Sequence, residues 1–248
     1  MTSGRAAPVL LSWLTLAGAA ASGTGSAIER LVLDRMAEAD IGDPLPPGWE
    51  VRTVSGSDVP SSRVTAQTGH DQLDRAIRFE ARGRQAAFFG LDLDTPLDPA
   101  TQRLAWQWRV DEPVPGADLR TPELDDAPAR FFVVFGRGGL FSSPEILFYS
   151  WGGSDEVGDH WTYRDDGSFR VMVLRNDRSP TGVWLTEARD LREDYLLTFG
   201  REPPPVTALG FMIDTDQTEA RASSRLGPIE AFQSARGPRK TLTPHTSR

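Results

Sequence analysis

Two aspartates that directly follow an apolar run form the most catalytic-looking motif of this sequence. The run at 209–213 leads into D-T-D-Q-T at 214–218. In one class of phosphatases a D-x-D-x-T pattern after a strand presents a nucleophilic aspartate and a magnesium ligand. Asp214 and Asp216 are alternatively candidates for calcium, but they supply only two of the roughly six to eight oxygens that this ion takes. The hydrogen-bonding habit of aspartate favours a third role, in which these carboxylates accept hydrogen bonds from loop amides.

A polar stretch at 154–167 carries the second set of candidate catalytic residues. It reads SDEVGDHWTYRDDG and contains His160 and Tyr163. A histidine and a tyrosine are suited to acid–base chemistry, such as β-elimination on the uronic acids of acidic polysaccharides. Arg109 would then bind the substrate. One histidine and one tyrosine in a loop are common by chance, so the pattern favours no catalysis.

Arg130 lies at the start of a segment that is apolar on both faces. The stretch at 125–137 reads DDAPARFFVVFGR, which is typical of a central strand covered on both sides. A buried arginine requires a carboxylate partner. Asp126, Asp214 or Asp216 could supply it, and a structural ion pair is favoured over a ligand-binding arginine.

The segment RLAWQWRVD at 103–111 has two faces of different character. Trp106 and Trp108 point to one side of the predicted strand, and Gln107 and Arg109 point to the other. Two tryptophans on one face could form a platform on which a sugar stacks. The apolar neighbours on the same face favour a place in the core instead. Gln107 and Arg109 would then face outward, where a ligand groove could lie.

The segment EILFYSWGG at 145–153 places Tyr149 and Trp151 on one face of a predicted strand that ends at glycines. Aromatic residues with a polar tip at a strand end are suited to a binding edge, and equally to the rim of a sandwich. We therefore include both residues among the ligand-binding candidates.

The elements that must position these residues are short strands. Each is bounded by Gly, Pro, Asp or Ser and is rich in Val, Phe, Trp and Ile. One segment near 190–199 has helical spacing instead, with Asp190 as N-cap and Gly200 as C-cap. The predicted strands span 49–54, 62–67, 75–81, 85–93, 103–111, 129–136, 145–151, 168–175, 183–189, 206–214 and 226–233.

Such an order predicts an all-β fold, an antiparallel jelly-roll-like β-sandwich with one short helix. It excludes the phosphatase, whose α/β sheet would need far more than the thirty or so residues left after Thr218.

The first 27 residues predict a secretory signal peptide. Arg5 precedes an apolar run at 7–21, and small residues then offer cleavage after Ala21 or Ala27. The expected location is the bacterial periplasm or the medium. No other segment approaches the ~20 apolar residues of a spanning helix, so we expect no integral membrane protein after cleavage.

The remaining chain divides into a helical or linker segment at 28–43, a β-sandwich domain at 44–233 and a disordered tail at 234–248. No cysteine occurs among the 248 residues, which excludes disulfides, thiolate metal ligands and a lipid anchor on cysteine. The formal net charge of −8 argues against nucleic acid and against anionic membranes as partners.

Several segments, in their order along the chain, resemble one family, the domain of unknown function 3047. They are PPGWE, LAWQWRVD, DDAPARFFVVF, FYSWG, GVWLTEARDLREDYLLTFG and ALGFMIDTDQTEARA, and they cover roughly 44–232. The resemblance implies an exported bacterial β-sandwich and transfers no catalytic residues. Where the family tends to have an acidic residue after a glycine, this sequence has Pro228 after Gly227.

The sequence contains no nucleophile elbow, no H-E-x-x-H zinc motif and no P-loop. The favoured hypothesis is therefore a non-catalytic exported module, without a cofactor, that binds a carbohydrate or another envelope ligand. The alternative is a periplasmic polysaccharide lyase or hydrolase. A structural envelope protein without a small ligand is the third hypothesis.

Overall fold

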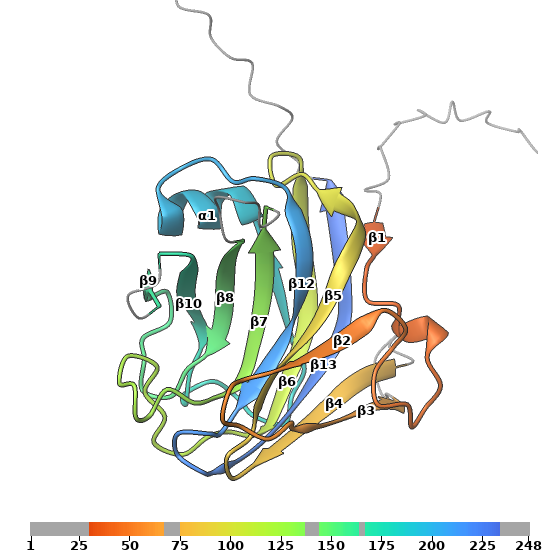
Figure 1. The fold of residues 1–248 in the computed structure, drawn as a ribbon. Coiled ribbons are helices and arrows are strands. Elements are labelled where there is room, and N and C mark those ends of the chain that lie inside the picture. The colour runs from red at the N-terminus through yellow and green to blue at the C-terminus, as the bar shows by residue number, and fades with distance from the viewer. Residues whose placement is uncertain (1–29, 67–74, 137–143, 164–166, 234–248) are drawn as a thin grey trace, which may run out of the picture.

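Alternation of apolar and polar residues along the strands sorts the chain into two sheets that pack face to face (Figure 1). The computed structural model describes residues 30–66, 75–136, 144–163 and 167–233. The predicted all-β sandwich with one short α-helix is confirmed.

Sheet A contains six of the described strands. They follow the order β11-β6-β13-β4-β3, and β1 also pairs with β13. The strands are β1 (Arg30–Val32), β3 (Ser61–Ala66), β4 (Arg75–Arg82), β6 (Gln102–Glu112), β11 (Leu185–Arg189) and β13 (Arg221–Gln233).

Sheet B contains seven of the described strands, in the order β2-β5-β12-β7-β8-β10-β9. The strands are β2 (Trp49–Thr53), β5 (Ala86–Leu97), β7 (Ala127–Phe135), β8 (Glu145–Trp151), β9 (His160–Thr162), β10 (Phe169–Arg175) and β12 (Val206–Asp214).

The prediction of an antiparallel sandwich needs one correction, since β10 runs parallel to β8. The chain leaves β8, forms the three-residue β9 at the edge of the sheet, and turns back so that β10 fills the space between them. A strand as short as β9 carries too little alternation to be recognised in the sequence.

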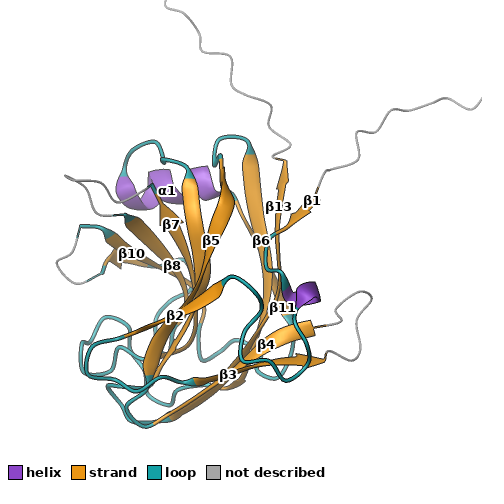
Figure 2. Ribbon diagram, turned by 45° about the vertical axis from the view of Figure 1, so that its right-hand side comes forward, coloured by secondary structure: helices purple, strands orange, loops and turns teal. Residues whose placement is uncertain are grey.

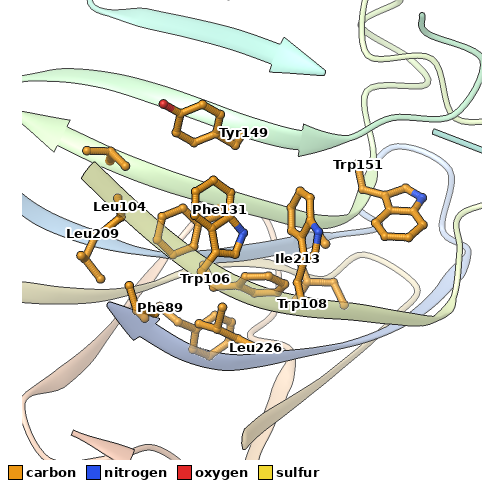
Figure 3. Packing of buried hydrophobic residues seen from close by; sticks show 14 of the residues in the cluster. Phe89, Leu104, Trp106, Trp108, Phe131, Tyr149, Trp151, Leu209, Ile213 and Leu226 are labelled. Carbon is orange, nitrogen blue, oxygen red and sulfur yellow. The ribbon is translucent and has the colours of Figure 1, made fainter. Parts of the chain in front are cut away.

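The two inner faces form one large apolar core (Figure 3). Trp106 and Trp108 point into it with about 1% and 0% of their surface exposed, which confirms the core prediction for these tryptophans. The ring of Trp106 stacks on Phe131 of the opposite sheet at 4.2 Å between centroids. The Nε1 of Trp108 donates a hydrogen bond of 3.0 Å to the carboxylate of Glu187.

The predicted helix is present as α1 (Leu191–Phe199), and it lies across one end of the sandwich (Figure 1). The carboxylate of Asp190 accepts a hydrogen bond of 3.2 Å from the amide of Glu193, which is the geometry of an N-cap. Gly200 has a φ of 75° and ends the helix in the left-handed region that glycine adopts without strain.

Of the segment predicted as helical or linker at 28–43, the described part from Arg30 onward belongs to the sandwich instead. This part contains β1 and a single turn of 3-10 helix, η1 (Met36–Glu38). Figure 2 shows β1 beside β13 at the edge of sheet A. Between β1 and η1, the buried carboxylate of Asp34 accepts hydrogen bonds from the amides of Met36 (2.8 Å) and Ile229 (2.7 Å). These bonds fix the segment to the sandwich, because a buried carboxylate has no water to replace them.

The predicted signal peptide at 1–27 and the predicted tail at 234–248 lie outside the described residues. Within the described ranges, no helix is both long and apolar enough to cross a bilayer.

Candidate functional site

The outer face of sheet A carries the residues that the sequence assigned to a possible groove. Because Trp106 and Trp108 point into the core, Gln107 and Arg109 point to the opposite side of β6. Both side chains are partly exposed there. The structure therefore agrees with the predicted outward orientation of these two residues.

A hollow of about 540 Å³ lies on this face, where β11, β6, β13 and β1 run side by side. We call it the sheet A groove. Its lining combines small side chains with longer polar and aromatic ones. Six of the lining residues are Ala105, Gln107, Thr186, Ala188, Pro228 and Phe232.

One edge of the groove carries charged side chains. Arg30 of β1 donates to Glu230 of β13 at 3.0 Å, and both side chains line the groove. Asp34 also lines it but is only 2% exposed, and its two oxygens accept the backbone amides described above. Burial raises the pKa of Asp34 despite these hydrogen bonds. Asp34 therefore acts as a structural anchor beneath the groove.

Trp184 is a candidate ligand contact that our sequence analysis missed. It directly precedes β11 and lies out of phase with Leu185, which packs against the core. A β-carbon at Gly227 would lie 3.2 Å from the Cζ3 of Trp184 and 3.1 Å from the Cβ of Gln107. The indole thus packs over glycine backbone and beside Gln107, and it remains partly exposed. Its alternation with Leu185 was the signal that could have revealed it.

The sequence profile described as "Protein of unknown function (DUF3047)" matches residues 47–230. This chain belongs to the DUF3047 family. Among curated proteins, none matches the sequence.

Several solved structures resemble this DUF3047 protein. The family 11 carbohydrate-binding module from Clostridium thermocellum is 10% identical and has a TM-score of 0.49, with 86% of this chain and 100% of that chain covered. The K2 cleaved adhesin domain of Lys-gingipain is 11% identical, with coverage of 83% and 98% and a TM-score of 0.45. A xylan-binding CBM22-1 domain from Paenibacillus barcinonensis is 17% identical, with coverage of 80% and 99% and a TM-score of 0.36. Similarities of this strength say nothing about what the DUF3047 protein binds.

The profile match leaves one wall of the groove outside its range. The match begins at residue 47, whereas β1 supplies Arg30 and Val32 to the groove. In this DUF3047 protein the groove is therefore completed by residues that precede the matched part of the chain.

Arg130, a candidate ligand contact, lies instead in a buried network of charges. Its side chain is 1% exposed and pairs with Asp125 at 2.6 Å and with Asp214 at 3.4 Å. Tyr163 donates to the other oxygen of Asp125 at 2.6 Å. The favoured structural ion pair is therefore present, and Asp214 is one of its predicted partners. A guanidinium enclosed in this way offers no surface to a ligand. The alternative prediction, that Arg130 binds a ligand, is therefore wrong.

Asp126, the other predicted partner of Arg130, serves a different purpose. Its oxygens accept hydrogen bonds from the amides of Gln217 (3.1 Å) and Thr218 (2.7 Å). It thereby fixes the loop that follows β12. Adjacent aspartates of one loop thus have different partners.

The charges of this network do not balance. Asp125, Asp126 and Asp214 are all buried near a single guanidinium, that of Arg130. Burial raises the pKa of Asp214 to about 8, the neighbouring carboxylates add to this shift, and Arg130 opposes it. Asp125 is the closer counter-ion of Arg130, at 2.6 Å against 3.4 Å for Asp214.

The predicted metal ligands have protein partners in the structure. Asp214 accepts a hydrogen bond of 2.6 Å from the amide of Ala127, and Asp216 accepts one from the hydroxyl of Ser57. Across the described ranges, no cluster of three or more His, Cys, Asp or Glu residues is arranged to hold a metal ion. The favoured role of Asp214 as an acceptor for a backbone amide is confirmed.

Tyr149 and Trp151 lie in the core and not at an open edge, with 0% exposure each. The hydroxyl of Tyr149 donates to Asp194 at 2.8 Å, and Asp194 also pairs with Arg189. Burial and the nearby Asp194 raise the pKa of Tyr149 well above its usual value. The predicted binding edge is therefore wrong in its geometry, because enclosed side chains offer no contact surface.

The three residues of the catalytic alternative do not meet. Arg109 lies on the outer face of sheet A and pairs with Asp111. His160 is exposed on β9 of sheet B, and the hydroxyl of Tyr163 is bound to Asp125. A lyase needs its acid, base and cation around one substrate, and this arrangement does not provide that.

Proposed function

We propose that this DUF3047 protein is a non-catalytic, exported module that binds a carbohydrate in the sheet A groove. The observation that carries the proposal is that a partly exposed indole, Trp184, lies beside Gln107, which lines an open hollow of about 540 Å³. A hollow of this size falls within the range of roughly 300–1,000 Å³ that is typical of ligand sites.

The lining suits the two-sided chemistry of sugars. A sugar ring has an apolar face, which packs on aromatic surfaces such as Phe232 in the lining and Trp184 beside Gln107. Its hydroxyl groups both donate and accept hydrogen bonds. The amide of Gln107 and the hydroxyl of Thr186 match this, since each has donor and acceptor capacity.

The carboxylates at the groove favour binding over hydrolysis. Glycosidases use two carboxyl groups that both reach the scissile bond. Here Glu230 is paired with Arg30, and Asp34 is 2% exposed with both oxygens bound to amides. A substrate in the groove would meet no free acid–base pair formed by these two residues.

Export is the part of the proposal that rests on the first 27 residues. A positive residue, an apolar run and small residues follow one another there as in a secretory leader. Expression of the full chain in a bacterial host, followed by fractionation and N-terminal sequencing, tests it. Recovery of uncleaved protein in the cytoplasm would contradict export and would leave the groove proposal unaffected.

Binding of the purified protein to a panel of soluble and insoluble polysaccharides tests the groove. We expect Trp184→Ala and Gln107→Ala to weaken binding at least tenfold, a loss of about 1.4 kcal/mol each. Trp161→Ala is the matched control, because Trp161 is a partly exposed tryptophan of sheet B that lies under the guanidinium of Arg120. Absence of binding to every polysaccharide, or loss only in the control variant, would refute the proposal.

A further inference from the structure

Four arginines lie side by side across sheet A. In the strand register, Arg63 of β3 pairs with Arg78 of β4, Arg78 pairs with Arg225 of β13, and Arg225 pairs with Arg109 of β6. Residues adjacent to them in the strands, such as Ile77 and Trp108, point into the core, so all four arginines lie on the outer face. We call this row the arginine ladder.

The arginine ladder destabilises the folded state. Neighbouring strands are about 4.8 Å apart, and like charges placed directly opposite each other destabilise a sheet. Ion pairs offset this only in part. Asp111 bridges Arg109 and Arg225, and Glu80 pairs with Arg78 at 2.7 Å. Four guanidinium groups thus share two carboxylates, in a protein whose formal net charge is −8.

The ladder keeps hydrogen-bond donors free. The side chains of Arg78, Arg109 and Arg225 are 40%, 31% and 23% exposed, and Arg63 is exposed as well. Among the described residues, Arg63 forms no ion pair, and the buried Nε of Arg78 donates to no group of the protein. A bound anion could accept hydrogen bonds from the exposed ends of these guanidinium groups and relieve the repulsion between them at the same time.

A second cationic pair extends the same face. Arg82 of β4 lies directly opposite Arg221 of β13, and both side chains are exposed. Local positive charge therefore accumulates on the outer face of sheet A, against the acidic balance of the whole chain. A local field of this kind attracts anionic ligands even when the net charge is negative.

The ladder runs beside the proposed carbohydrate site. Arg109 is two residues from Gln107 on β6, and Arg225 is two residues from Gly227, over which Trp184 packs. Residues two apart on a strand share a face at a separation of about 7 Å. A polymer that lies across the strands and contacts Trp184 therefore passes along the ladder.

We infer that the ligand of the sheet A groove is an anionic polysaccharide whose carboxylates pair with the arginine ladder. This inference rests on the proposed function and specifies its ligand class. The planar fork of arginine matches a carboxylate with two parallel hydrogen bonds. Single-stranded nucleic acid would need a series of aromatic platforms along the strand, whereas the row of paired residues across β3, β4, β13 and β6 consists of arginines.

The probe is polygalacturonate, a soluble polymer of uronic acid, and the neutral comparison is a soluble β-glucan. Titration calorimetry with the purified protein should show tighter binding to the polyuronate. The double variant Arg63→Gln and Arg78→Gln should weaken this binding at least tenfold and reduce its dependence on salt, because fewer ions are exchanged. The matched control is Arg52→Gln with Arg178→Gln, which removes the same charge from exposed positions away from the ladder.

The outcomes separate the two proposals. Equal affinity of the wild type for both polymers, or wild-type affinity in the ladder variant, overturns the ladder inference. If Trp184→Ala still abolishes β-glucan binding in that case, the carbohydrate proposal stands. Binding of neither polymer nor any other glycan overturns both, and tighter binding of a single-stranded oligonucleotide than of the polyuronate overturns the glycan assignment. A melting temperature of the ladder variant equal to or above that of the wild type confirms that it is folded.

Discussion

Replacing Asp214 by asparagine tests whether a protonated carboxyl group stabilises the buried network. Burial and two neighbouring carboxylates raise the pKa of Asp214 to about 8 in the folded protein, whereas an unfolded aspartate titrates near 4. Between these values the folded state binds a proton that the unfolded state does not. Stability is therefore highest below about pH 4 for this group and falls as the pH rises toward 8.

The size of the effect follows from proton linkage. One proton difference changes the free energy of unfolding by about 1.4 kcal/mol per pH unit. Between pH 5 and pH 7 the wild type should therefore lose up to about 2.7 kcal/mol that Asp214→Asn does not lose. The asparagine keeps an oxygen for the amide of Ala127 and removes the titration.

Urea unfolding at pH 5, 6 and 7, followed by the fluorescence of the buried tryptophans, measures this difference. Asp216→Asn is the matched control, because Asp216 lies two residues away, is only partly buried and bonds to Ser57. Its pH profile should parallel that of the wild type. Parallel profiles for the wild type and Asp214→Asn would refute the reasoning and would mean that Asp214 is ionised in its pair with Arg130.

Two further substitutions test the packing and the helix end. Gly210→Ala would place a β-carbon 2.2 Å from the carbonyl oxygen of Phe89 and 2.5 Å from the ring of Phe132, so we expect a loss of roughly 1–3 kcal/mol in urea unfolding. Gly90→Ala, at the paired position, meets only that ring at 3.8 Å and should change stability by less than about 1 kcal/mol; equal effects would contradict the clash. Asp190→Ala removes the N-cap of α1 and should cost about 1 kcal/mol in thermal unfolding, whereas Asp190→Asn should retain most of the cap. Equal losses in the two variants would show that the charge of Asp190, which also pairs with Arg103, matters more than the cap.

Local patterns predicted the local features of this fold well. Period-two alternation placed Trp106 and Trp108 inside and Gln107 outside. Successive side chains of a strand point to opposite faces, so the order of apolar and polar residues shows directly which face is buried. The ends of α1 could also be predicted from the sequence, because Asp190 and Gly200 act on the backbone next to them.

Features that depend on strand register could not be predicted from the sequence. The arginine ladder joins β3, β4, β6 and β13, whose pairing is set by the whole sandwich and not by any one segment. Asp214 was among the predicted partners of Arg130, but its closer partner, Asp125, was missed for a related reason. Asp125 and Asp126 are adjacent, yet the first pairs with Arg130 and the second holds a loop some 90 residues away in sequence. The short strand β1 was missed because its residues Leu31 and Val32 are exposed and do not alternate in burial.

The pairing of β1 with β13 has a consequence for when the groove can form. The ion pair between Arg30 and Glu230 joins residues 200 positions apart, so the first described strand finds its place only when the last one is present. Contacts of such long range form slowly, because the chain must pay the loop-closure entropy before they stabilise it. Until β13 has been synthesised, the N-terminal wall of the groove therefore has no strand to pair with. The sheet A groove can therefore form only in a chain that contains both β1 and β13.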